Sequence, residues 1–559
     1  MIKKILLLMA VVALSCNIAI ADRFVNLTPT PANMTVGQGD FKIPHGMKIT
    51  TRGLTPEMQA EVSRFVKEFN ASTGLDVRMG KKGQMVIGSD LGIAPEGYNL
   101  DVTSRGINLV AATPAGLYYG LQTIKKILPA NVMAGKPGTP ETDYVLPEMK
   151  VVDEPAYGYR GFMLDVSRHF FTTDEIKRML DVMSYYKLNR FHWHLTDDQG
   201  WRLPVDKYPL LTTVGATAPD VRITDMEKKT QYMAGKPYGP YSYTKEELKD
   251  IVEYAAQRHI QVVPEVDMPG HFVAALVAYP EYSCDPSADR KVWTDGGVSK
   301  DVLNVANPDA VNFAGDVIDE LAEIFPYPYI HIGGDECPTE AWENNADCKA
   351  LMEKEGLTNA RQLQSRFIKQ MSDRAATHGK RLYMWNEVLT SEGADTTMLG
   401  DIEASIFAWW PADESIKKAT ANKLPVVYTP FGPYYINRRQ TPDSAPGAGK
   451  GDDDVKRTYE VVPFATAVPG SEEYHMGVQG TFWTEHVSDP EYMEHLALPR
   501  LIAIAEAGWT PQSKKNFADF QKRITADSEL LDLGGYKYTK LYMLEPVGKS
   551  TGPDVAGEE

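Results

Sequence analysis

Residues 161–196 read GFMLDVSRHFFTTDEIKRMLDVMSYYKLNRFHWHLT, and this stretch decides the fold. Its ends, GFMLDV at 161–166 and FHWHLT at 191–196, are short and largely apolar, which is typical of buried strands. Between them, residues 173–187 repeat apolar side chains at a spacing that places them on one face of a helix. The stretch therefore predicts a strand, an amphipathic helix and a second strand.

The same rhythm continues along the chain. A further helix is predicted at 244–257, because residues 243–247 (YTKEE) offer a capped, acidic first turn. Eight strands with interleaved helices predict an α/β fold, a (β/α)8 TIM barrel over residues 151–546. A doubly wound open sheet is the alternative, but it needs a phosphate-binding glycine loop, and no convincing one occurs. The remaining strand-like runs lie at 261–266, 329–333, 381–385, 405–409, 425–428 and 479–483.

A smaller unit precedes the barrel. Residues 23–150 predict an α+β domain with a hairpin at 98–111 and a helix at 114–128, and the Pro/Gly-rich stretch 135–140 marks its exit. After the barrel, residues 547–559 are rich in glycine and acid, so we expect a disordered tail.

The N-terminus predicts export. Two lysines precede an apolar run at 5–14, as in a secretory signal peptide, which we place at 1–21. Two endings compete: cleavage after Ala21, or a lipoprotein-type cleavage that would leave a lipid anchor on Cys16. A periplasmic or outer-membrane-anchored protein is expected. The formal net charge of −17 argues against nucleic acid as a partner.

Three cysteines remain in the mature chain. Cys337 and Cys348 could form a disulfide at their loop length, but the sequence cannot show their geometry, and Cys284 would stay unpaired. No cysteine or histidine spacing matches a metal site that we would trust, so we expect neither metal nor organic cofactor. The oligomeric state cannot be deduced.

Polar side chains close each predicted strand. In such a barrel the C-terminal strand ends meet on one rim, where active sites are built. Carboxylates suit acid–base work on a glycosidic bond, and flat indole faces suit stacking on sugars. The strand-end residues are Asp165, Arg168 and His169; Asp197 and Asp198; Glu265, Asp267 and His271; Asp335 and Glu336; Trp385 and Glu387; Trp409 and Trp410; Tyr434 and Tyr435; and Trp483 and Glu485.

The triplet His192-Trp193-His194 lies within the second predicted strand. Alternate strand residues share a face, so the two histidines could bind a metal together. No third ligand follows at a fixed spacing. We therefore expect both rings to be satisfied inside the barrel.

Several long motifs, in order, resemble family-20 glycoside hydrolases, the β-N-acetylhexosaminidases. The residues before the barrel, 115–123 (AGLYYGLQT), resemble the end of that family's small N-terminal α+β domain. The resemblance covers nearly the whole mature chain. The barrel motifs are RGFMLDVSRH at 160–169, HWHLTDDQGWR at 192–202, PEVDMPGH at 264–271, HIGGDE at 331–336 and FWTE at 482–485.

The resemblance implies an exo-acting, retaining β-N-acetylhexosaminidase that releases terminal non-reducing GlcNAc or GalNAc from an oligosaccharide or glycoconjugate. The family is an exception to the rule of a carboxylate nucleophile. Its substrate's 2-acetamido oxygen attacks the anomeric carbon and forms an oxazolinium ion. Glu336 would be the acid and later the base, Asp335 would bind the acetamido N–H, and Tyr435 would hold the acetamido oxygen.

The resemblance also implies substrate-binding residues. His271 and Asp197 would form a relay behind the acid, and Arg168 and Glu485 would clamp the ring hydroxyls O3 and O4. The three tryptophans Trp385, Trp409 and Trp483 would wall the pocket.

One position departs from the family pattern. Members commonly carry Tyr-x-Asp on strand seven, where the chain has Tyr435-Ile436-Asn437. The amide of Asn437 removes a charge near C6 of the sugar, so a narrow specialist for 6-sulfated GlcNAc is an alternative. A non-catalytic carbohydrate-binding protein on the same scaffold is another, which the intact Asp335, Glu336 and Tyr435 argue against.

Overall fold

The computed structural model describes residues 23–225, 228–294, 296–397, 402–441 and 453–540. The expected signal segment 1–21, with Cys16, and the expected tail 547–559 lie outside the described residues. Within the described part of the chain, no helix is both long and apolar enough to cross a bilayer.

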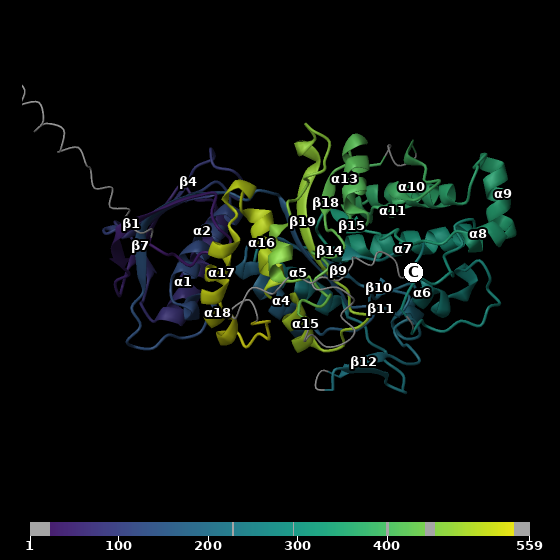
Figure 1. Cartoon of the computed structure of the whole chain (residues 1–559), viewed down its shortest axis with the longest axis horizontal. Helices are drawn as coiled ribbons and strands as arrows, with labels where there is room; N and C mark the ends of the chain where they lie inside the picture. The colour runs from purple at the N-terminus through teal and green to yellow at the C-terminus, as the bar shows by residue number, and fades with distance from the viewer. Residues whose placement is uncertain (1–22, 226–227, 295, 398–401, 442–452, 541–559) are drawn as a thin grey trace, which may run out of the picture.

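A closed barrel of eight parallel strands forms the larger domain (Figure 1). Strand β8 pairs with β9 on one side and with β19 on the other, which closes the ring. Each strand overlaps an apolar run expected from the sequence, so the predicted barrel is confirmed. The strands are β8 (Tyr159–Asp165), β9 (Arg190–His194), β14 (Gln261–Glu265), β15 (Tyr329–His331), β16 (Arg381–Trp385), β17 (Ala404–Ala408), β18 (Val426–Tyr428) and β19 (His475–Phe482).

The first barrel helices begin where the sequence predicts. Helix α4 (Thr173–Tyr185) starts at a capping box in which Thr172 and Glu175 satisfy each other's backbone N–H groups. Helix α5 (Lys245–Ala256) starts at the same device, built from Thr244 and Glu247. The apolar face of α4 joins the main hydrophobic core.

Other helices follow the barrel strands or lie in the loops around the barrel. They are α6 (Val273–Ala278), α7 (Pro308–Ile324), α8 (Glu340–Asn344), α9 (Ala346–Glu355), α10 (Arg361–Ala376), α11 (Glu387–Thr390), α13 (Ala412–Ala421), α14 (Val455–Glu460), α15 (Pro490–Ala497), α16 (Arg500–Trp509), α17 (Phe517–Ala526) and α18 (Ser528–Leu533). Two short hairpins pair β10 (Thr196–Asp197) with β11 (Gly200–Trp201), and β12 (Arg222–Asp225) with β13 (Thr230–Met233).

The N-terminal domain is a mixed seven-stranded sheet in the order β1-β7-β5-β6-β4-β2-β3. The expected hairpin is β5 and β6, and the expected helix is α2 (Pro114–Ile127). Helices α1 (Pro56–Thr73) and α2 lie on the barrel side of the sheet (Figure 1), and the short helix α3 (Ala130–Met133) contacts α1, α2 and α18. Its strands are β1 (Asn33–Lys42), β2 (Lys48–Arg52), β3 (Arg78–Met79), β4 (Met85–Ser89), β5 (Tyr98–Thr103), β6 (Gly106–Ala111) and β7 (Val145–Asp153), the last of which runs past residue 150.

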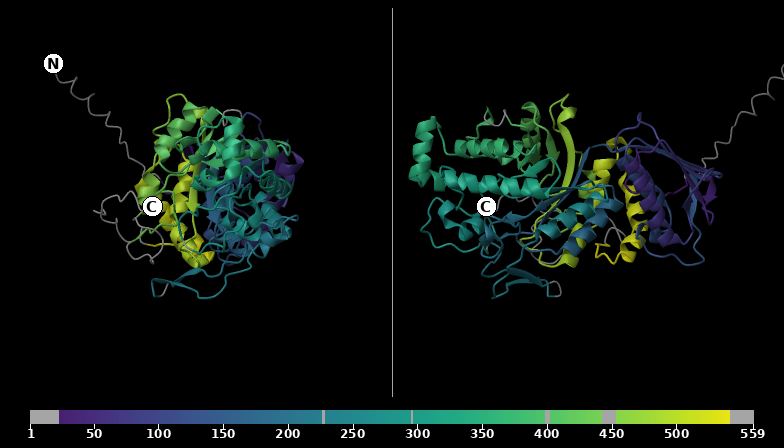
Figure 2. Two further views of the ribbon diagram at one scale, coloured as in Figure 1. Left: turned by 90° about the vertical axis from the view of Figure 1, so that its right-hand side faces the viewer. Right: turned by 180° about the vertical axis from the view of Figure 1, so that it is seen from behind.

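The C-terminal helices α16, α17 and α18 lie between the barrel and the N-terminal sheet, as Figure 1 and the right view of Figure 2 show. Trp509, the last residue of α16, is fully buried and belongs to the hydrophobic core of the N-terminal domain. Lys126 of α2 forms a buried ion pair with Asp527, with 2.9 Å between Nζ and Oδ2. The two domains therefore share one interface made by segments distant in sequence.

Asp153 is the centre of this interface. Its carboxylate accepts hydrogen bonds from the Tyr98 hydroxyl at 2.7 Å and from Trp509 Nε1 at 3.0 Å. Lys187 Nζ lies 3.2 Å from it, and all of these side chains are buried. Burial lowers the pKa of Lys187, and the Asp153 charge opposes that effect. The buried cation thus depends on this single carboxylate for its charge balance.

Asp153→Ala should lower the free energy of unfolding by about 3–5 kcal/mol, because Lys187 would be left buried without its partner. Urea unfolding at neutral pH measures the difference. The matched control is Asp143→Ala, which removes an ion pair to Lys42 whose side chains are 64% and 65% exposed. The control should cost less than about 1 kcal/mol. Equal losses in the two variants would contradict the role of Asp153.

Candidate active site

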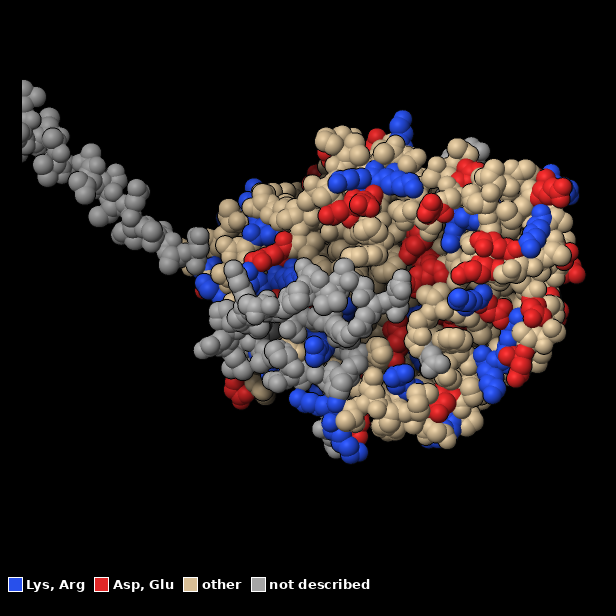
Figure 3. Space-filling view, turned by 45° about the vertical axis from the view of Figure 1, so that its right-hand side comes forward, with Lys and Arg blue, Asp and Glu red and all other residues tan. Residues whose placement is uncertain are grey.

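The residues expected at the site lie at the C-terminal ends of the barrel strands or directly after them. Acidic side chains gather along a hollow on the face seen in Figure 3. Asp335 and Glu336 follow β15, Arg168 follows β8, Asp197 ends β10, His271 follows β14, Trp385 ends β16, Trp409 follows β17, Tyr435 and Asn437 follow β18, and Trp483 and Glu485 follow β19.

The backbone that carries Asp335 and Glu336 is unusual. Gly333 and Gly334 have φ angles of +64° and +84°, and Glu336 itself has a φ of +41°. A Cβ on Gly333 would lie 1.9 Å from Asp267 Oδ1, so only glycine allows the close approach of that carboxyl group. Gly334 N–H donates a hydrogen bond to the same oxygen at 2.9 Å. A non-glycine residue at positive φ costs energy and is typical of functional sites.

Asp335 is buried, and its surroundings bias its protonation. Burial raises the pKa of Asp335 to about 6. Burial, together with the Asp335 charge, raises the pKa of Asp267 well above its usual range, so Asp267 is a neutral acid that can donate a hydrogen bond to Asp335. Asp335 Oδ1 has no hydrogen-bond partner among the described residues.

A chain of charged groups runs behind Glu336. His271 Nε2 lies 3.4 Å from Glu336 Oε2, and His271 Nδ1 lies 3.2 Å from Asp197 Oδ1. Burial would lower the pKa of His271, but the Asp197 charge outweighs it and raises that pKa well above its usual range. Arg168 Nη2 holds Asp197 at 2.8 Å. Glu336, in contrast to this buried chain, has a side chain 43% exposed. Among these charged side chains, Glu336 is thus the one that solvent or substrate reaches.

The row of charged side chains behind Glu336 continues into the barrel through His194. Its Nε2 lies 3.0 Å from Asp197 Oδ2, and its Nδ1 lies 2.5 Å from Glu265 Oε2. Burial opposes the charged ring, but the Glu265 charge outweighs burial and raises the pKa of His194 to about 10. Trp385 Nε1 also donates to Glu265, at 2.8 Å. His192 Nε2 and His331 Nδ1 each lie 2.9 Å from Glu265 oxygens.

Aromatic side chains line the other part of the rim. Trp409 and Tyr435 are stacked, with 5.9 Å between ring centroids and 22° between planes. Trp483 lies 6.4 Å from Tyr435 and 5.9 Å from Trp385. Trp409 Nε1 donates to Glu387 at 2.7 Å, which fixes that indole. The four rings form a continuous wall suited to a sugar and its apolar substituents.

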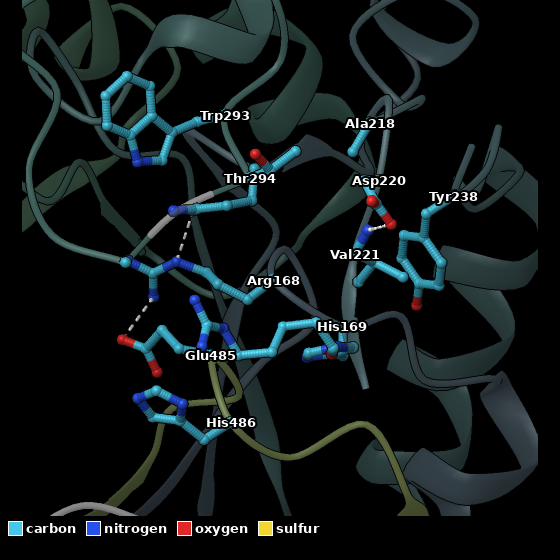
Figure 4. Close-up of a pocket in the computed structure, with 13 residues that line it drawn as sticks. Arg168, His169, Ala218, Asp220, Val221, Tyr238, Trp293, Thr294, Glu485 and His486 are labelled. Atoms are coloured by element: carbon cyan, nitrogen blue, oxygen red, sulfur yellow. Dashed lines mark hydrogen bonds and ion pairs between the residues drawn. The ribbon is translucent and has the colours of Figure 1, made fainter. Parts of the chain in front are cut away.

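Arg168 connects the relay to a neighbouring pocket (Figure 4). Its Nη1 lies 3.1 Å from Asp165 and 3.7 Å from Glu485 Oε1, and its Nε donates to Gln199 at 2.8 Å. Burial raises the pKa of Glu485. The labelled side chains of His169, Tyr238 and His486 surround the same pocket.

The sequence identified most of this cluster but missed part of it. Glu265, Asp267 and Glu387 were recognised as strand ends without a role, although strand-end position was the available signal. His194 was expected inside the barrel, and no sequence signal showed that it joins Glu265 to Asp197. Asn437 stands apart: its amide oxygen is buried without a partner among the described residues.

Three groups of histidine and carboxylate side chains come close enough to share a metal: His192, Glu265 and His331; Asp197, Asp198 and His271; and Asp267, His271 and Asp335. In each group, a histidine nitrogen already lies close to a carboxylate of the protein. The expectation of no metal stays a prediction.

The chain matches two domains of one glycosidase family. Residues 157–512 match the glycosyl hydrolase family 20 catalytic domain, and residues 25–154 match domain 2 of that family. The chain belongs to glycosyl hydrolase family 20. The family predicted from the sequence motifs is therefore confirmed.

Named relatives agree with this membership. The chain is 36% identical to a β-hexosaminidase of Porphyromonas gingivalis. The matched region covers 95% of this chain and 66% of that protein, just under two thirds of its length. It is 32% identical to a β-hexosaminidase of Akkermansia muciniphila, over 79% of this chain and 85% of that protein.

Solved structures agree as well. An exo β-N-acetylglucosaminidase from Vibrio harveyi, in complex with N-acetylglucosamine, superposes with a TM-score of 0.79 at 27% identity, covering 92% of this chain and 78% of that one. An N-acetyl-β-hexosaminidase from Streptomyces plicatus, in complex with thio-NAglucal, gives 0.76 at 31% identity, covering 92% and 96%. The two-domain fold is thus shared with these structures over 92% of the chain.

The raised pKa of Asp335 predicts a pH-dependent stability. Because the folded state binds this proton more tightly than the unfolded chain, wild-type stability should fall as pH rises from about 4 through 6. Asp335→Asn removes this pH dependence of stability. The free energy of unfolding of the variant should therefore be about 1–3 kcal/mol higher than that of wild type at about pH 8 and equal to it at about pH 4. Urea unfolding at both pH values measures this. A constant difference between the proteins would sink the assignment.

Proposed function

We propose that the chain is an exo-acting, retaining β-N-acetylhexosaminidase that releases terminal non-reducing GlcNAc or GalNAc with the substrate's acetamido group as nucleophile. The observation that supports it best is the exposed Glu336 carboxyl, 3.4 Å from a His271 that is backed by Asp197. A carboxyl group that faces the ligand and has a charged histidine behind it can give and take a proton in turn.

Glu336 protonates the glycosidic oxygen as the bond breaks and later removes a proton from the attacking water. When Glu336 loses its proton, the nearby His271 cation stabilises the new carboxylate. Asp197 keeps that cation charged, because it is itself held by Arg168 and His194. The relay therefore lowers the cost of charge changes on the acid without touching the sugar.

The acetamido group needs a fixed pose to attack the anomeric carbon. Asp335 Oδ1, which has no partner among the described residues, accepts a hydrogen bond from the acetamido N–H and stabilises the positive charge that develops on the oxazolinium ring. Tyr435 donates to the acetamido oxygen, since burial raises the pKa of its hydroxyl well above the usual range and keeps it protonated. Trp385, Trp409 and Trp483 enclose the methyl group.

The ring hydroxyls are held on the other side of the site. Arg168 and Glu485, 3.7 Å apart, contact O3 and O4 of the terminal sugar. A clamp on these hydroxyls favours a chain end, which supports exo-action. We also propose export to the periplasm or outer membrane, on the basis of the signal-like residues 1–21.

Glu336→Gln tests the acid. Its kcat should fall by about 10²–10⁴-fold on an N-acetylglucosamine disaccharide, whose leaving group needs a proton. The loss should be smaller on the p-nitrophenyl β-N-acetylglucosaminide, because nitrophenolate leaves more easily. Steady-state rates on both substrates give the comparison.

The matched control is Glu403→Gln. Glu403 is exposed and directly precedes β17 at the opposite end of the barrel, so both rates should stay at the wild-type level. Unchanged turnover in Glu336→Gln would remove the acid assignment. Equally fast cleavage of a β-glucoside that lacks the acetamido group would remove substrate assistance.

Tolerance of a 6-sulfate is a second candidate, which is favoured by the neutral amide of Asn437, whose oxygen has no partner within the described part of the chain. Asn437→Asp should lower kcat/KM on 6-sulfated N-acetylglucosaminide by about tenfold or more relative to the plain substrate, because like charges placed together repel. Rates on the two aryl glycosides measure the ratio. An equal change on both substrates would contradict a role for Asn437 at C6.

A further inference from the structure

Two thiols outside the catalytic cluster lie in contact. Cys284 follows the short helix at Pro280–Tyr282, and Cys348 lies in the first turn of α9. The interaction between their side chains raises the pKa of Cys284 and lowers that of Cys348, and both residues are free cysteines in this structure. Cys337 does not join them: its Sγ is buried and directed to the Pro338 carbonyl oxygen at 3.8 Å. The bridge between Cys337 and Cys348 considered from the sequence is therefore not the pairing that the fold favours.

The backbone around the two thiols is held on both sides by one residue. Asn345 Nδ2 donates to the Cys284 carbonyl oxygen at 3.0 Å, and Asn345 Oδ1 accepts from the Cys348 N–H at 3.0 Å. Asn304 adds a second tie, because its Oδ1 accepts from Cys348 Sγ at 3.5 Å while its N–H donates to the Tyr282 carbonyl oxygen. Two segments 64 residues apart in sequence (348 − 284) are thus fixed side by side.

We propose that Cys284 and Cys348 are a disulfide site that is closed when the protein reaches an oxidising compartment. The proposal rests on the export expected from residues 1–21 and not on the sugar chemistry. Extracytoplasmic compartments favour such bonds. The contact between the thiols and the shared Asn345 supply the proximity that a disulfide needs.

The reaction is a thiol–disulfide exchange with a disulfide oxidant, such as an oxidoreductase or oxidised glutathione. The partly exposed Cys284 loses its proton and attacks the oxidant, which forms a mixed disulfide and releases one oxidant thiol. Cys348 then loses its proton, attacks Cys284 Sγ and expels the second oxidant thiol. Two protein thiols are oxidised, and the oxidant disulfide takes up both electrons and both protons.

The bond would brace the groups behind the acid. The loop that starts at Cys284 donates to Asp198 from Trp293 N–H, at 3.1 Å to the carbonyl oxygen, and from Ser299 N–H, at 3.4 Å to the carboxylate. Asp198 in turn lies 3.3 Å from His271. Cys348 is on the segment that follows Glu336. A covalent bond here therefore joins the two segments that flank the relay.

The test is a thiol map of the full mature chain, purified from an oxidising compartment without reductant and alkylated after denaturation. We expect a peptide that links Cys284 to Cys348, with only Cys337 alkylated. Dithiothreitol should lower the melting temperature of wild type by several degrees, because the open chain gains conformational freedom when unfolded. Cys284→Ser and Cys348→Ser should melt at that lower temperature, and dithiothreitol should not change their melting temperatures. Cys337→Ser is the matched control and should keep both the link and the reductant response.

Alkylation of all three cysteines, even after incubation with oxidised glutathione, would overturn the proposal, and so would a link that includes Cys337. Turnover of the p-nitrophenyl substrate is measured in the same samples. An active enzyme without the link defeats only this inference, whereas a linked but inactive protein defeats only the proposed function.

Discussion

The Glu265 carboxylate sits inside the barrel with no contact with water, and the site is arranged around it. A buried carboxylate is costly unless its oxygens are hydrogen-bonded to charged or polar groups. Here His194 and Trp385 donate to it, and both belong to strands that end at the rim. The need to satisfy one interior charge therefore sets the orientation of a relay histidine and of a tryptophan in the sugar-facing wall. Removal of Glu265 would release both.

Strain and burial make the site rigid before any sugar arrives. Glu336 and His271 both have positive φ angles, which the surrounding contacts must hold. Because residues 333 and 334 are glycines, the neutral acid Asp267 can closely approach the backbone that precedes Asp335 and Glu336. A preorganised arrangement of this kind spends little free energy on reorientation during the reaction. The backbone conformation thus already places part of the catalytic side chains.

The barrel could be predicted because buried parallel strands are short, nearly continuous apolar runs, and polar residues at their ends stand out. Asp335, Glu336, Trp409 and Tyr435 were found in this way. The Glu265 network could not be predicted, because it depends on which side chains four separate strands bring together. The surroundings of Cys348 were equally hidden, since the sequence spacing only allowed a pairing with Cys337, while the fold brings Cys284 near it through the hydrogen bonds of Asn345.

Trp509 completes the hydrophobic core of a domain that begins almost five hundred residues earlier. During synthesis on a ribosome, domains generally acquire structure from the N-terminus onward. The first domain of this chain cannot finish its core in that order, because one of its largest side chains is translated after all eight barrel strands. Part of the apolar surface of this domain therefore stays uncovered until the C-terminal helices have been made.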